Sequence, residues 1–264
     1  MAQDAGPFHL YKPAPPLSRF VDFFWIYEGY APPHRRERLL PTGTTELVFS
    51  VDASGRAVSG VSGPRSESFM LDTSTPFSAI AIHFMPGGGF PFFGVPSTEL
   101  RNESVELELL WGRCAAGIRD RLWEAQTAEK RFEILEHALL MRGRGRFDRH
   151  AAVRYALDAF DRSKGVRPVG DVIEFVGLSP RRFGELFRSE VGLSPKTFCR
   201  IRRFNEVLTR IERTSEVDWS DVALSCGYFD QAHFNHDFRA LAGLTPSAYL
   251  RDRVSRTHVV VSSA

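Results

Sequence analysis

The sequence predicts an α+β protein in two parts, with a β-rich N-terminal domain that ends in helices and an all-α C-terminal domain. Short runs of β-branched and aromatic residues, such as "TELVFSVD" and "SAIAIHF", recur through the N-terminal part and are separated by Gly, Pro and Ser. From about residue 104 onward, apolar residues recur at helical spacing. A chain of 264 residues can form two domains that each bury a core.

The composition is typical of an ordinary soluble protein, with 43% hydrophobic and 25% charged residues. No apolar run approaches the ~20 residues that a membrane span needs. The first residues contain no basic segment followed by an apolar stretch, so we expect no export signal, a cytoplasmic location and no membrane partner. Cys114, Cys199 and Cys226 lie far apart in sequence, and we expect them to be reduced core thiols.

The charge is unevenly distributed. Residues 1–141 carry 13 Lys and Arg against 17 Asp and Glu, whereas residues 142–264 carry 21 against 15. A mildly acidic half joined to a basic half suits a polyanion-binding module attached to a second domain. Six excess positive charges are also typical of a solvated surface, so the charge alone decides little.

Changes in composition predict four segments. The first is a β-rich sensor or dimerisation domain over residues 1–110, and the second is a helical connector over 111–147 that ends in the basic, glycine-broken "RGRGRF". An all-α domain follows over 148–254, and a loose tail over 255–264. The helices of the connector fit a dimer surface and a plain link equally well.

The all-α domain contains one unit twice. The offset is 51 residues along the second helix of the unit and 50 residues upstream of it. The matched pairs include Phe183 with Phe234, Phe187 with Phe238, Arg188 with Arg239, Gly192 with Gly243, Pro195 with Pro246, and Gly177 with Gly227. Two copies indicate a duplicated unit and not a solenoid.

Each copy predicts a helix-turn-helix. In the first copy, "GDVIEFV" forms a short apolar helix that ends at Gly177, and Ser179 caps a second helix that begins at Pro180. Two short helices joined by a tight turn, with polar residues on the outer side of the second, are typical of this motif. We expect the units at about 168–192 and 218–243, joined by a helix over about 195–212.

The polar face of the second helix suits the reading of DNA bases, because base edges in the major groove present hydrogen-bond donors and acceptors. Gln231, Asn235 and His236 have side chains of that kind. The helix between the units would span roughly 27 Å at ~1.5 Å per residue. That length could place two reading helices near one ~34 Å turn of DNA apart, in successive major grooves.

The two segments "GLSPRRFGELFRSEVGLSPKTFCRIRR" and "VALSCGYFDQAHFNHDFRALAGLTPSAY" resemble the AraC/XylS family of bacterial transcription regulators, over about residues 150–252. The stretches "LLPTGTTELVFS" and "FMPGGGFPFFGVPSTEL" resemble an uncharacterised domain often found upstream of that module. The resemblance implies a double helix-turn-helix that binds DNA. It implies no ligand for the N-terminal domain.

The chain departs from the family in the first unit. Ile173 stands where members usually have a small residue, so we expect looser contact between the helices of that unit than in the second, which keeps Ala223. Gly184 has no side chain to present, and Glu185 repels phosphate, so Arg181 and Arg182 should make most contacts there. We therefore expect the second unit to supply much of the specificity.

These arguments give two sets of candidate DNA-contacting residues. The base-contact candidates are Arg181, Arg182, Glu185, Gln231, Ala232, Asn235 and His236. The phosphate-contact candidates are Ser179, Arg188, Lys196, Arg200, Arg202, Arg203, Arg239 and Thr245.

Other chemistry has weaker support in the sequence. His233 and His236, with Asp237 adjacent, lack a third ligand at convincing spacing, so we expect no metal and no cofactor. Gly87–Gly89 are not followed by Gly-Lys-Ser/Thr and predict a β-turn and not a phosphate loop. The N-terminal aromatic residues suit a core first and an effector pocket second. We find no catalytic set among His34, His83, Glu46 and Arg65.

The sequence therefore predicts a non-enzymatic, sequence-specific DNA-binding transcription regulator, modulated by a small-molecule effector through its N-terminal domain. Double-stranded DNA is the expected partner, with RNA polymerase, the effector and a second copy of the chain as further candidates. The alternative is an N-terminal enzyme that processes a small molecule and is fused to a DNA-binding module. Activation and repression of transcription fit the sequence equally.

Overall fold

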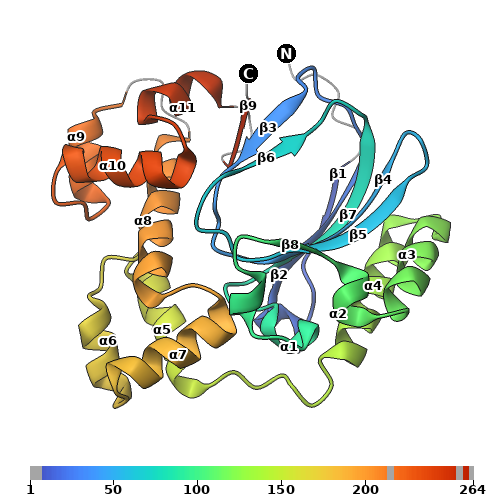
Figure 1. The fold of residues 1–264 in the computed structure, drawn as a ribbon, viewed down its shortest axis with the longest axis horizontal. Coiled ribbons are helices and arrows are strands. Elements are labelled where there is room, and N and C mark those ends of the chain that lie inside the picture. The colour runs from blue at the N-terminus through green and yellow to red at the C-terminus, as the bar shows by residue number, and fades with distance from the viewer. Residues whose placement is uncertain (1–7, 213–216, 254–257, 262–264) are drawn as a thin grey trace.

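The structure is a computed structural model that describes residues 8–212, 217–253 and 258–261. It confirms the predicted fold class, with a β-rich half that carries helices on one side and an all-α half beside it (Figure 1). The strands are β1 (Phe8–Tyr11), β2 (Val21–Tyr30), β3 (Arg36–Leu39), β4 (Glu46–Asp52), β5 (Ala57–Ser62), β6 (Phe69–Asp72), β7 (Phe77–Phe84), β8 (Ser104–Glu106) and β9 (Val259–Val261). The helices of the β-rich half are α1 (Phe90–Phe93), α2 (Leu107–Trp111), α3 (Cys114–Glu124) and α4 (Ala128–Arg142). The helices of the all-α half are α5 (Ala151–Arg162), α6 (Val169–Val176), α7 (Pro180–Val191), α8 (Pro195–Ile211), α9 (Trp219–Ser225), α10 (Gln231–Ala242) and α11 (Pro246–Asp252).

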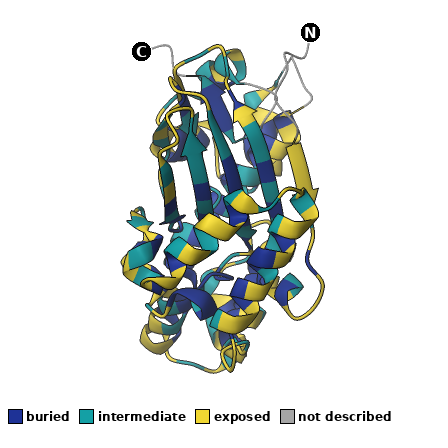
Figure 2. Cartoon of the chain, turned by 90° about the vertical axis from the view of Figure 1, so that its right-hand side faces the viewer, coloured by how far each residue is buried: buried dark blue, intermediate teal, exposed yellow. Residues whose placement is uncertain are grey.

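The larger sheet is antiparallel, in the order β1-β2-β7-β4-β5-β8. Strands β4 and β5 alternate between buried and less buried residues over part of their length, because successive side chains point to opposite faces. The central strand β7 is buried without a break from Ala79 to Ile82, and Figure 2 shows buried residues along the middle of the sheet. One face presents Phe24, Leu47 and Ile82 to helices α2–α4, where Trp111 and Leu135 complete the core. The aromatic residues predicted to fill a core do so at Phe20, Phe24, Phe84, Phe92 and Phe93, whereas Phe23, Trp25, Tyr27 and Phe90 are partly buried.

The prediction of helical structure from about residue 104 onward is wrong for the first three residues. Ser104–Glu106 form strand β8, which pairs with β5 and extends the sheet by one strand. Helix α2 begins only at Leu107. The apolar faces of α3 and α4, including Leu122 and Leu139, are then buried against the sheet. These faces therefore serve the core of the β-rich half.

The predicted helix caps in the duplicated units are confirmed. The Ser179 side chain accepts a hydrogen bond from the Arg182 amide, and the Asp230 side chain accepts one from the His233 amide. Helix α6 ends at Gly177, which has a φ of 67°. Each cap satisfies a backbone group that the helix leaves without a partner.

The two units differ in how tightly their helices pack. Helix α9 packs against α10, and Ala223 is fully buried there. Helix α6 makes its main contacts with α5 and not with α7, and the Phe175 ring stacks on the Tyr155 ring with centroids 4.2 Å apart. This weak contact between α6 and α7 agrees with the expectation from Ile173, which is larger than Ala223 at the matching position of the second unit.

The predicted loose tail is wrong for Val259–Val261. These residues form β9, which pairs with β3 in a second, three-stranded sheet of order β6-β3-β9. The β-branched run buries Val259 and Val260 and lies on an otherwise open strand edge. Residues 255–257 and 262–264 of that tail lie outside the described residues. The C-terminal end of the chain is thus part of the β-rich half.

Both helix-turn-helix units contact the β-rich half through the glycine that ends the second helix. Gly192 and Gly243 have φ values of 83° and 71°. A Cβ atom at Gly192 would lie 2.4 Å from Cγ of Pro64, and one at Gly243 would lie 2.6 Å from Nη1 of Arg38. Both positions favour glycine for their backbone conformation. At Gly192 the close approach to Pro64 and to the Ser97 carbonyl also excludes a side chain, whereas at Gly243 the neighbour is the end of the flexible Arg38 side chain. None of the helices in the described part of the chain is long and apolar enough to cross a membrane.

Cys199 and Cys226 are buried, as expected of core thiols, and burial raises the pKa of the Cys199 thiol to about 12. The expectation is wrong for Cys114, which is exposed at the start of α3.

Replacing Val260 with Ala should lower the free energy of unfolding by about 1–3 kcal/mol, because it removes buried methyl groups and leaves a cavity. Its neighbour Val261 is only partly buried, so Val261→Ala should cost less. Denaturant titration of both variants checks this. Equal stability of the Val260 variant and the parent protein would contradict the docking of β9.

Candidate nucleic-acid interface

The second helix of each unit presents polar residues to solvent over its first two turns. On α10, Phe234, Asp237 and Phe238 are buried. The exposed residues are Gln231, Ala232, His233, Asn235 and His236. All four base-contact candidates of the second unit therefore lie together on one accessible helix face.

A hollow of about 280 Å³ adjoins this face of the second unit. It brings base-contact candidates Gln231 and Asn235 beside phosphate-contact candidates Arg239 and Thr245. Trp219 and Ser247 also line it, and the sequence argument missed both. Ser247 follows the repeated cap Thr245-Pro246, which was its only signal in the sequence. The hollow joins α10 to the starts of α9 and α11.

The Gln231 side chain is oriented by the preceding helix. The hydroxyl of Ser220 donates a hydrogen bond to Oε1 of Gln231 over 3.1 Å. Since the amide oxygen of Gln231 is engaged, its NH₂ group is the part left to face a partner. This group donates, so it suits acceptors such as N7 of a purine.

The first unit presents a different surface. Arg181 is 90% exposed and pairs with Glu185 one turn later, with Nε 3.0 Å from Oε1. A Cβ atom at Gly184 would lie 3.2 Å from Nη1 of Arg188. The Arg188 guanidinium therefore lies across the place that a side chain at residue 184 would occupy. Arg188 was predicted as a phosphate contact, yet it reaches the reading face of α7.

A buried carboxylate fixes α10 on α8. The Asp237 side chain is 5% exposed. It accepts hydrogen bonds from Nη2 and Nε of Arg200, at 2.8 and 3.2 Å from Oδ1. Arg203 approaches the same carboxylate at 3.9 Å and donates to the carbonyl of Gly227. A charge taken out of water needs such partners.

These pairings divide the phosphate-contact candidates on α8. Arg200 and Arg203 serve Asp237, and Arg202 pairs with Asp161 of α5. Lys196 is exposed near the start of the helix. Arg203 also lies 5.0 Å from the ring centroid of Tyr228, where burial and then Asp237 raise the pKa of the phenol. The geometry favours a structural role for the three arginines.

The remaining candidates are located as follows. Ser179 and Thr245 use their side-chain oxygens as helix caps, for α7 and α11. Arg182, Arg188 and Arg239 are exposed. His233 approaches Asp237 at 3.9 Å, and no three His, Cys, Asp or Glu side chains of the described residues gather into a group that could hold a metal ion. Gly87–Gly89 form a tight turn before α1, as predicted.

The N-terminal candidates His83 and Glu46 are brought together by the pairing of β4 with β7. Nδ1 of His83 lies 3.2 Å from Oε1 of Glu46, and Nε2 lies 3.3 Å from the Thr44 hydroxyl. His34 and Arg65 lie elsewhere, against Glu37 and Ser104 respectively. His83 and Thr44 line a cavity of about 260 Å³ where the two halves meet.

Replacing Arg200 with Ala should lower the free energy of unfolding by about 1–3 kcal/mol, since Asp237 loses charged hydrogen bonds. Lys196→Ala on the same helix is the matched control and should stay within about 0.5 kcal/mol. Denaturant titration gives both values. If the Arg200 variant unfolds like the Lys196 variant, Asp237 does not depend on this arginine.

Comparison with known proteins adds to this geometry. A family model described as a helix-turn-helix domain matches residues 173–252, and one described as a domain of unknown function (DUF6597) matches residues 9–106. The probable transcriptional regulator LumQ of Photobacterium leiognathi is 27% identical over 81 residues, which are 31% of this chain and 32% of LumQ. The chain thus spans about a third of that relative.

Solved structures are similar at low identity. ToxT from Vibrio cholerae is 12% identical, with 94% of this chain and 98% of ToxT covered at a TM-score of 0.42. The C-terminal domain of AraT, a response regulator from Geobacillus stearothermophilus, is 23% identical, with 40% of this chain and 88% of that domain covered at a TM-score of 0.37. The C-terminal part of this chain thus matches a helix-turn-helix domain model over residues 173–252, and its N-terminal part matches the model of a domain of unknown function over residues 9–106.

Proposed function

We propose that this protein is a sequence-specific DNA-binding regulator of transcription. The observation that carries the proposal is the exposed face of α10, where Gln231 and Asn235 adjoin Arg239. Hydrogen-bonding side chains beside a cation suit a base edge and its neighbouring phosphate. The family match and the relative described as a probable transcriptional regulator support the same proposal.

The second unit is the stronger reader in this proposal. Gln231, whose oxygen is held by Ser220, donates through its NH₂ group to a purine acceptor. Asn235 lies one turn further along α10 and can pair with adenine through its N6 and N7 atoms. His236 and Ala232 flank them, and Ala232 offers a methyl group to thymine.

The first unit contributes chiefly positive charge. Arg182 is exposed, and Arg188 reaches the reading face over Gly184. Arginine commonly recognises O6 and N7 of guanine, so Arg188 joins the base-contact candidates. The pair between Arg181 and Glu185 holds a cation and an anion together on this face. Glu185 thereby limits contact with phosphate.

A small-molecule effector would act through the β-rich half. Both units contact that half through their glycine turns, and α8 joins them (Figure 1). A ligand that shifts either contact changes the separation or tilt of the reading helices, and so the affinity for DNA. RNA polymerase and a second copy of the chain are further partners in this proposal. The proposed location is the cytoplasm, where the protein would bind DNA.

The enzyme alternative has its best support in the series Thr44, His83 and Glu46, which are joined by hydrogen bonds. The Thr44 hydroxyl also lies 2.6 Å from the hydroxyl of Thr42, so it has a second partner. The series lies where the halves meet, beside Asn205, which donates to the carbonyl of Thr42. This position favours a role in docking the halves.

The full chain should select specific duplexes from a random pool, with an affinity that falls as salt rises. Arg182, Lys196 and Arg239 are exposed cations on the proposed interface. Three phosphate contacts predict a slope of log K against log salt of about −2.7, so a fourfold rise in salt should weaken binding roughly 40-fold. A folded protein that recovers no duplex, or binds without salt dependence, would refute the proposal.

Replacing Gln231 or Asn235 with Ala should cost about 1–3 kcal/mol on the selected duplex, and the loss should map to one or two base pairs. Binding to scrambled duplexes should change little. Gln126, an exposed glutamine of the β-rich half, supplies the control variant Gln126→Ala. Fluorescence anisotropy on both duplexes measures the effect, and an equal loss on both would argue against base reading.

A further inference from the structure

The end of α4 and the segment after it form a groove with an unusual charge balance. The groove has a volume of about 420 Å³, within the range of small-molecule sites. It lies on the β-rich half, away from the reading helices. Its lining residues are Phe93, Gly94, Val95, Leu109, Leu110, Met141, Arg142, Arg144 and Arg146. The lining thus contains three arginines and no acidic residue.

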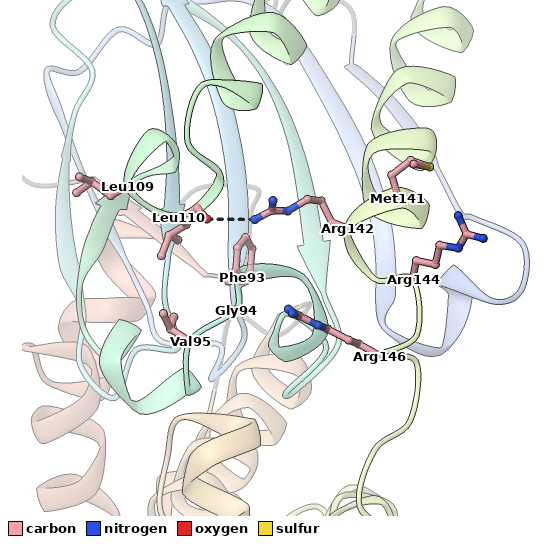
Figure 3. A pocket seen from close by; sticks show the side chains of 9 residues that line it. All are labelled: Phe93, Gly94, Val95, Leu109, Leu110, Met141, Arg142, Arg144 and Arg146. Atoms are coloured by element: carbon pink, nitrogen blue, oxygen red, sulfur yellow. Dashed lines mark hydrogen bonds between the residues drawn. The ribbon is translucent and has the colours of Figure 1, made fainter.

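Two of the arginines, Arg142 and Arg146, extend into the groove, which no acidic residue lines. Figure 3 shows Arg142 and Arg146 extending toward Leu110 and Gly94, whereas Arg144 turns away from them. Among the described residues, no acidic side chain forms an ion pair with any of the three arginines. Nη2 of Arg142 donates to the carbonyl of Leu110 over 3.1 Å. Burial lowers the pKa of Arg142, the nearby Cys114 partly opposes this, and the charge of Arg146 lowers the pKa slightly further. An anion between the two groups would relieve this repulsion.

The walls of the groove are apolar and open to solvent. Leu109 is 77% exposed and Met141 is 57% exposed, which is unfavourable for large apolar side chains unless something covers them. Phe93 and Leu110 line the floor. A ligand that pairs with the arginines and also covers the exposed apolar side chains would carry one anionic group and an apolar body of a few carbon atoms.

The cavity between the halves meets these demands less well. Its charged groups already have partners inside the protein, in Lys164 with Glu206 and His83 with Glu46. Asn205 of the same cavity bonds to the Thr42 carbonyl. The groove at the end of α4, in contrast to this cavity, is lined by arginines and by no acidic residue.

We propose that this groove binds a small amphipathic anion, a carboxylate or phosphate monoester with an apolar body, between Arg142 and Arg146 and over Leu109 and Met141. The proposal deepens the proposed function, on which it rests for its regulatory meaning, by naming the class of effector. Arg144 stands at the rim and adds long-range attraction.

The groove has a path to the first helix-turn-helix unit. Arg146 lies three residues before Arg149, in the segment that joins α4 to α5. Nη2 of Arg149 donates to the Pro86 carbonyl, and Nε lies 3.7 Å from Oε2 of Glu190, near the end of α7. Glu190 also accepts from the His150 amide. A ligand that draws Arg146 inward therefore pulls on the segment that holds α7.

The test is calorimetric titration of the full chain, without DNA, using four probes. Octyl phosphate and octanoate carry the charge and the apolar body, octanol lacks the charge, and inorganic phosphate lacks the apolar body. We expect both amphipathic anions to bind at least about tenfold more tightly than octanol or inorganic phosphate. The tighter of the two anions identifies the preferred acidic group. If no probe binds, or if octanol equals the anions, the proposal is overturned.

Variants assign the binding to the groove. Arg146 is exposed and its side chain holds no other described group, so Arg146→Gln should fold normally and weaken the anion about tenfold. Leu109→Glu should place a competing carboxylate in the groove and weaken it at least as much. Arg121→Gln, at an exposed arginine of α3, should change nothing. Wild-type affinity in both groove variants would contradict the site. Because DNA is absent, failure here leaves the DNA-binding proposal to its own test.

Discussion

The turn Gly-Leu-Ser/Thr-Pro that follows the reading helix of each unit constrains the whole molecule. It ends the reading helix at Gly192 or Gly243, and its hydroxyl residue caps the helix that follows. The same two glycines approach the β-rich half closely, and at Gly192 no side chain fits beside Pro64 and Ser97. The four residues of this turn therefore combine a glycine with positive φ, the cap of the next helix and a contact with the β-rich half. The duplicated turn orients each unit within its own domain and against the β-rich half.

The two units share this turn but diverge in how their reading helices are held. In the second unit, buried Asp237 of α10 binds Arg200 of α8, so the helix has a charged and directional link to the rod between the units. The repeat places Leu186 at the matching position of α7, where no such link can form. Both units also pack through aromatic residues, such as Phe187 against Phe198 in the first and Phe238 against Phe204 in the second. A helix fixed by a charged link suits the reading of bases, and the exposed arginines of α7 suit contact with phosphate and guanine.

Local rules made the helical half predictable from sequence. Ser179, Pro180 and Gly192 act on their own neighbours, so the caps and limits of α7 follow from residues a few positions apart. The failures involve partners far apart in the chain. In the sequence, Arg200 and Lys196 are both basic residues of the same helix, and nothing there distinguishes them. Only the fold shows that Arg200 binds Asp237, which lies 37 residues further along the chain. Strand β9 becomes ordered structure because an edge of β3 lies beside it. The groove at Arg146 required the folded positions of α2 and the turn after α1.

The central claim is that one chain presents two reading helices at a spacing fixed by α8, whose 17 residues span about 26 Å at ~1.5 Å per residue. Hydroxyl-radical footprinting of the full chain on a selected duplex tests it most directly. The account predicts two protected patches on one face of the DNA, centred about 10 base pairs apart. A single patch, or two patches on opposite faces, would contradict a rigid double reader.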